Sequence, residues 1–150
     1  MRSMMVSNAV RSSHAVHSLW PLEHHEVVHV LSGGWGDPPA LLAEGLAVWL
    51  SGQWQGQPVV TYARTIGARW LPYATLASTT DFRMGEELRT YAEAGALVGW
   101  LLDTRGKDGL RTVYGALNRR GGRAELEAAL GIKLADVDAA VQAWVKKAVP

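Results

Sequence analysis

Residues 25–29 read HEVVH and carry residue types that could perform hydrolytic chemistry. Two histidines four positions apart lie on one face of an α-helix, so both imidazoles of His25 and His29 can reach one metal ion. This HExxH pattern is typical of helices that bind zinc, for which imidazole nitrogen is a suitable ligand. Glu26 follows the first histidine, where it could take a proton from a metal-bound water without being a ligand itself.

A catalytic zinc site of this kind needs a third protein ligand and an open fourth position. No histidine follows His29, so the third ligand must be a carboxylate, and Asp37 and Glu44 are within reach. Asp37 lies between a glycine and a proline and is more typical of a turn or helix cap. Glu44 lies among apolar residues, where a carboxylate is costly to bury unless it is paired or metal-bound. The adjacent Gly45 would allow another backbone to approach closely. The alternative for Glu44 is a solvated position on the polar edge of a helix.

Apolar residues recur with a period near 3.6 along most of the chain, which predicts helices. These helices must then position the candidate site residues. Proline and glycine mark where several of them begin and end. We therefore expect a mainly α fold, with residues 1–18 as a flexible N-terminal arm and residues 19–150 as one helical domain. The expected helices are Leu19–Leu31, Pro39–Leu50, Val59–Trp70, Glu86–Thr104, Asp108–Leu117, Ala124–Leu130 and Leu134–Val149.

Composition excludes several classes of function. The formal net charge is only +1, so we expect no nucleic-acid partner. No apolar run approaches the ~20 residues of a membrane span. The absence of cysteine excludes thiolate metal sites and cysteine nucleophiles. The N-terminus lacks a signal-peptide pattern, so the default expectation is the cytoplasm, with an extracytoplasmic parent protein if the N-terminus is truncated. The seven tryptophans could serve the core or the contacts of a homo-oligomer.

Together with HEVVH, the segment LLAEGLAVWL resembles the gluzincin zinc metallopeptidases, in which a Glu-Gly pair follows HExxH on the next helix. The resemblance is to the peptidase MA-like family in particular. It continues through YAEAGALVGWLLDTRGKDGLRTVYGAL and ALGIKLADVDAAVQAWVKKAV, and so covers roughly residues 19–149. It implies the helical, C-terminal-type portion of a zincin-like catalytic domain. It also implies His25, His29 and Glu44 as ligands of one Zn²⁺ per chain, with Glu26 as the general base.

The same resemblance makes Tyr91 the best candidate for stabilising a developing oxyanion, the alternative being an ordinary core tyrosine. Glu93 could orient a zinc-bound histidine, although we expect it to be a solvated helix residue. The implied function is zinc-dependent hydrolysis of peptide bonds in a peptide or protein substrate. Gluzincins carry a β-sheet before the HExxH helix, and the 24 residues before His25 are too few for one. The alternative function is therefore a non-catalytic helical zinc-binding or protein-interaction module, from a truncated or degenerate peptidase.

Overall fold

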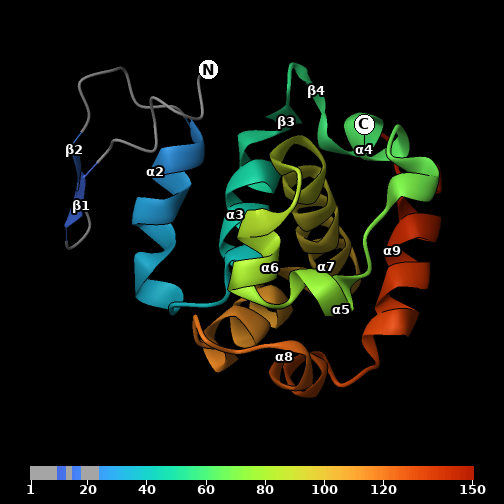
Figure 1. The fold of residues 1–150 in the computed structure, drawn as a ribbon. Helices are drawn as coiled ribbons and strands as arrows, with labels where there is room; N and C mark the ends of the chain where they lie inside the picture. The colour runs from blue at the N-terminus through green and yellow to red at the C-terminus, as the bar shows by residue number, and fades with distance from the viewer. Residues whose placement is uncertain (1–9, 13–14, 18–23) are drawn as a thin grey trace.

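The computed structural model of the protein describes residues 10–12, 15–17 and 24–150, and these are mainly helical, as the sequence predicts (Figure 1). In chain order the elements are β1 (Val10–Ser12), β2 (Ala15–His17), α2 (His24–Leu31), the 3₁₀ helix η1 (Ser32–Trp35), α3 (Ala40–Ser51), β3 (Gln53–Trp54), β4 (Gln57–Pro58), α4 (Val59–Arg64), the 3₁₀ helix η2 (Gly67–Arg69), α5 (Tyr73–Leu76), α6 (Thr79–Met84), α7 (Glu87–Ala116), α8 (Arg123–Leu130) and α9 (Leu134–Lys147). The strands form two antiparallel pairs, β1 with β2 and β3 with β4.

Helix α3 lies at the centre of the fold because its sequence is apolar on nearly every side. Almost all of its residues from Ala40 to Val48 are buried, as expected for a helix without a continuous polar face. It follows two prolines and ends at Ser51, and the next residue, Gly52, has the left-handed φ of 81° that favours glycine. Helix α2 packs on one side of α3, and α7 packs on another (Figure 1). The histidine helix is therefore held next to the helix that carries Glu44.

Small residues allow α3 and α7 to approach closely. A Cβ atom added to Gly45 would lie only 2.4 Å from the backbone oxygen of Ala94, and one added to Gly95 would lie 2.7 Å from Cγ1 of Val48. The close approach that the sequence predicts at Gly45 is therefore confirmed. Because Gly45 adjoins Glu44, this contact also fixes the position of the glutamate relative to α7.

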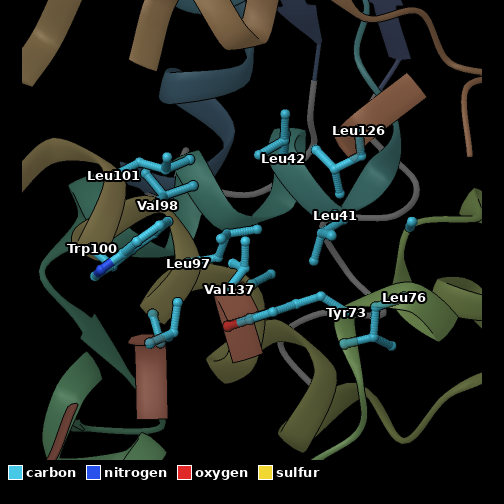
Figure 2. Packing of buried hydrophobic residues seen from close by; sticks show 14 of the residues in the cluster. Leu41, Leu42, Tyr73, Leu76, Leu97, Val98, Trp100, Leu101, Leu126 and Val137 are labelled. Atoms are coloured by element: carbon cyan, nitrogen blue, oxygen red, sulfur yellow. The ribbon is translucent and has the colours of Figure 1, made fainter. Parts of the chain in front are cut away.

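The hydrophobic core fills the space between α3, α7 and the C-terminal helices. Figure 2 shows Leu41 and Leu42 from α3 packed with side chains from α5, α7, α8 and α9, among them Tyr73, Leu76, Leu97, Val98, Leu101, Leu126 and Val137. Tyr73 is fully buried, and its hydroxyl donates a 2.7 Å hydrogen bond to the backbone oxygen of Glu93. The core thus anchors α7 against α3.

The two helices predicted on either side of Arg105 are present, and the range of α7 includes both of them. The break occurs at Gly106, where φ is 70° and ψ is −180°. Only glycine adopts such a conformation without strain. The sequence signal at Arg105-Gly106 therefore marks a real change of direction, as predicted.

The helix predicted over Val59–Trp70 is wrong as a single element. Helix α4 ends at Arg64, and the separate 3₁₀ turn η2 begins at Gly67, whose φ of 53° is outside the right-handed helical region. The apolar spacing continues past the end of α4 to Ile66, which is buried. Periodicity alone therefore does not detect the turn.

The start of the helix predicted from Leu19 lies outside the described residues, and within them α2 begins at His24. Parts of the predicted arm, residues 1–9, 13–14 and 18, also lie outside them. Among the described residues, no helix combines the length and apolarity that a membrane span requires.

Candidate metal centre

The two histidines of the HExxH segment lie side by side on α2. Their ring centroids are 4.9 Å apart, and the rings are nearly perpendicular. The side chain of His25 is 18% exposed and that of His29 only 8%, because α2 presents this face to α3. The Nε2 atoms of both rings point to the same place, 3.2 Å from each other.

Glu44 of α3 completes this cluster from the opposite side. Its Oε2 atom lies 2.9 Å from Nε2 of His25 and 3.0 Å from Nε2 of His29. Burial opposes ionisation of this carboxyl, but the hydrogen bonds from His25 and His29 outweigh it and hold the pKa of Glu44 well below its ordinary value. Glu44 is therefore a buried carboxylate, and the alternative of a solvated position on a polar helix edge is wrong.

The geometry of these three atoms fits a metal ion. Ligand atoms about 2.0–2.1 Å from a tetrahedral zinc ion are about 3.3 Å from one another, close to the 2.9, 3.0 and 3.2 Å found here. Hydrogen bonds account for only two of the three contacts. If both imidazoles donate Nε2–H to Oε2 of Glu44, the remaining 3.2 Å contact is between two donor nitrogens with no acceptor between them. A metal cation at the centre of the triangle would instead accept one lone pair from each of the three atoms, the two Nε2 and Oε2. These residues could therefore hold a metal ion.

The second oxygen of Glu44 is occupied by a residue of α6. Nη2 of Arg83 donates a 2.8 Å hydrogen bond to Oε1 of Glu44, and Nη1 donates a 2.7 Å hydrogen bond to the hydroxyl of Tyr91. The Glu44 carboxylate thus contacts the Arg83 guanidinium through Oε1 and the two imidazoles through Oε2. Arg83 was not among the residues predicted from the sequence, because nothing in the spacing of residues 44 and 83 indicates that α6 lies against α3.

Tyr91, the predicted oxyanion-stabilising residue, lies beside the cluster on α7. Its ring stacks on His25 with a centroid separation of 6.1 Å and on Trp54 with one of 5.2 Å. Burial raises the pKa of Tyr91 to about 12, so the hydroxyl keeps its proton at neutral pH. Trp54, from the β3–β4 hairpin, is held by a 2.8 Å hydrogen bond from its indole nitrogen to the Leu88 carbonyl. No pattern in the sequence predicts this hairpin.

The two other glutamates of interest are both buried. Glu26 lies in the first turn of α2 and is 4% exposed. Glu93 is fully buried, so its expected position as a solvated helix residue is wrong. The carboxyl group of Glu93 accepts hydrogen bonds from the backbone nitrogen of Leu71 at 3.1 and 3.3 Å. It therefore serves the connection between α7 and the segment before α5, and no contact of the described residues joins it to a histidine.

Comparison with protein-family models, curated proteins and solved structures gives no match to this chain.

Proposed function

We propose that the protein is a zinc-dependent metallopeptidase of the gluzincin type. The observation that carries this proposal is the convergence of His25 Nε2, His29 Nε2 and Glu44 Oε2 within 3.2 Å of one another. These residues come from an HExxH segment and from a Glu-Gly pair on the next long helix. The same residues in the same order characterise the family that the sequence resembles.

In this proposal His25, His29 and Glu44 hold the ion, and their low exposure excludes most of the surrounding water. When bound, zinc supplies Lewis acidity that lowers the pKa of water and polarises a carbonyl group. Two histidines and one carboxylate leave the open coordination position that such chemistry needs.

Glu26 acts as the proton carrier of the proposed reaction. Its carboxylate takes a proton from the attacking water while the oxygen bonds to the carbonyl carbon of the peptide. It then gives that proton to the amine nitrogen as the C–N bond breaks. Glu26 is one position after His25, about 100° further around α2, and its burial keeps the carboxylate on the protein side of the helix.

Tyr91 supplies a hydrogen-bond donor in the same proposal. Its protonated hydroxyl can donate to the carbonyl oxygen of the substrate as negative charge develops there. The Tyr91 ring stacks on His25, so this phenol lies beside one of the proposed ligands. Arg83 already donates to the same hydroxyl oxygen, so the hydroxyl proton is left for a further acceptor.

The test combines metal content with hydrolysis of a peptide library by the wild type, Glu26→Gln and the exposed control Glu86→Gln. We expect about one zinc per chain in all three proteins. We expect hydrolysis by the wild type and by Glu86→Gln and its loss in Glu26→Gln. An active Glu26→Gln variant would reject the proposed role of Glu26. A wild-type chain that binds zinc and hydrolyses no peptide would instead be the non-catalytic zinc-binding module.

A further inference from the structure

Arg83 connects two residues of the candidate centre through the two terminal nitrogens of one guanidinium group. One nitrogen donates to Glu44 and the other to Tyr91. A guanidinium is planar and its N–H groups have fixed directions, so a residue that binds two acceptors in this way restrains both. Tyr91 also contacts His25 through its ring, and Arg83 is therefore linked to two of the three candidate ligands.

The helix that carries Arg83 is itself firmly placed. Ser78 caps α6 by accepting a hydrogen bond from the Asp81 backbone nitrogen, and Phe82 is buried at 1% exposure. The Phe82 ring packs against Tyr91 with a centroid separation of 5.4 Å. Helix α6 also contacts α3, and Figure 1 shows it crossing in front of that helix. The guanidinium thus extends from a fixed point even though half of the Arg83 side chain is exposed.

A carboxylate can bind a metal through one oxygen or through both. In Glu44 the oxygen Oε1 faces Arg83, and only Oε2 faces the two imidazoles. With Oε1 occupied, the ligand set is two nitrogens and one oxygen. That set suits a small tetrahedral ion with one open position rather than a larger ion that prefers many oxygen ligands.

We propose that Arg83 is a positioning residue that holds Glu44 by Oε1, so that Glu44 offers a single oxygen to the metal. This inference rests on the metal site of the proposed function and goes beyond it, because it assigns the number of oxygen ligands to a residue outside the HExxH and Glu-Gly motifs. Loss of Arg83 frees Oε1 to turn toward the ion and removes the restraint on Glu44.

The chain offers a matched control for the charge of Arg83. Arg119 also binds a carboxylate, that of Asp37 at 3.1 Å, but both side chains of that pair are largely exposed. An ion pair between exposed groups contributes little to order or stability. Arg119→Gln therefore removes one arginine–carboxylate pair and one positive charge without touching Glu44.

The experiment measures zinc affinity by competition with a chromophoric chelator and the visible spectrum of the Co²⁺-loaded protein. The proteins are the wild type, Arg83→Gln, Arg83→Lys and Arg119→Gln, each shown to be folded by circular dichroism. We expect Arg83→Gln to bind zinc about 10–100-fold more weakly, the usual effect of losing a residue that orients a ligand. We also expect weaker visible absorption per cobalt, as the ion gains a fourth protein ligand atom and departs from tetrahedral geometry. Arg83→Lys should recover only part of the affinity, because one ammonium does not reproduce the fixed fork of the guanidinium.

The outcomes separate this inference from the proposed function. Wild-type affinity and an unchanged cobalt spectrum in Arg83→Gln would overturn the positioning role while leaving the metal site intact. Full recovery by Arg83→Lys would overturn the requirement for the guanidinium geometry. A wild-type chain that binds neither zinc nor cobalt would overturn the proposed function, and the inference with it.

Discussion

The contact between Gly45 and α7 provides a sharp test of how the fold positions Glu44. In Gly45→Ala the new Cβ would lie 2.4 Å from the oxygen and 2.8 Å from the carbon of the Ala94 carbonyl. Ordinary van der Waals contact begins near 3.4 Å, so the two helices must separate by about 1 Å. The obstacle is backbone, which cannot turn away as a flexible side chain can.

The expected cost follows from two opposing effects. Adding a methyl group to a packed interior costs about 1–3 kcal/mol, and the upper part of that range applies because the clash involves α7 itself. The greater helix propensity of alanine returns up to about 1 kcal/mol. We therefore expect a net loss of about 2 kcal/mol in the free energy of unfolding, which for a chain of this length lowers Tm by about 4–8 °C.

Urea unfolding followed by circular dichroism measures this loss, with Gly33→Ala as the control. A Cβ on Gly33 meets no atom within 4 Å, so that variant should remain within about 0.5 kcal/mol of the wild type. We also expect zinc binding to weaken in Gly45→Ala alone, since the substitution displaces the segment that carries Glu44. A Gly45→Ala variant as stable as the wild type would refute the close helix contact.

Three further results are expected. Burial raises the pKa of Glu93 from 4.5 to about 8. Between about pH 4.5 and pH 8 the folded protein keeps a proton on Glu93 that the unfolded chain releases. The free energy of unfolding therefore falls as the pH rises through this range. In urea titrations the wild type should lose about 3 kcal/mol more than Glu93→Gln between pH 5 and pH 8; parallel profiles would contradict this. Tyr91→Phe should lower kcat/KM by about 10²–10³-fold with zinc content unchanged, whereas an unchanged rate would leave Tyr91 only a packing role. Zinc at about 100 times its dissociation constant should raise the wild-type Tm by about 5–10 °C, reversibly with a chelator; an unchanged Tm would contradict specific binding to the folded state.

Much of the candidate site was predictable because it depends on local spacing. The i, i+4 relation on a helix brings His25 and His29 together whatever the rest of the fold does. Glu44 was predictable for a different reason, since a carboxylate within an apolar helix needs a partner. Gly45 indicated close packing of that helix, and the structure confirms the contact.

Features that depend on tertiary contacts were not predictable in this way. Arg83 reaches Glu44 across 39 positions of sequence, and no periodic pattern connects them. Glu93 has the spacing of an exposed helix residue, yet the backbone of Leu71 passes over it and buries it. The turn at Gly67 interrupts a regular apolar pattern, because a single glycine can end a helix without changing the residues around it.

The proposed function requires that His25, His29 and Glu44 bind one divalent metal ion. Anomalous diffraction at the zinc edge, from crystals of the zinc-loaded protein, would locate that ion. We expect one strong peak per chain, about 2.0–2.2 Å from Nε2 of each histidine and from Oε2 of the glutamate. A zinc-loaded crystal without a peak among these three atoms, or with its zinc held elsewhere on the chain, would contradict it.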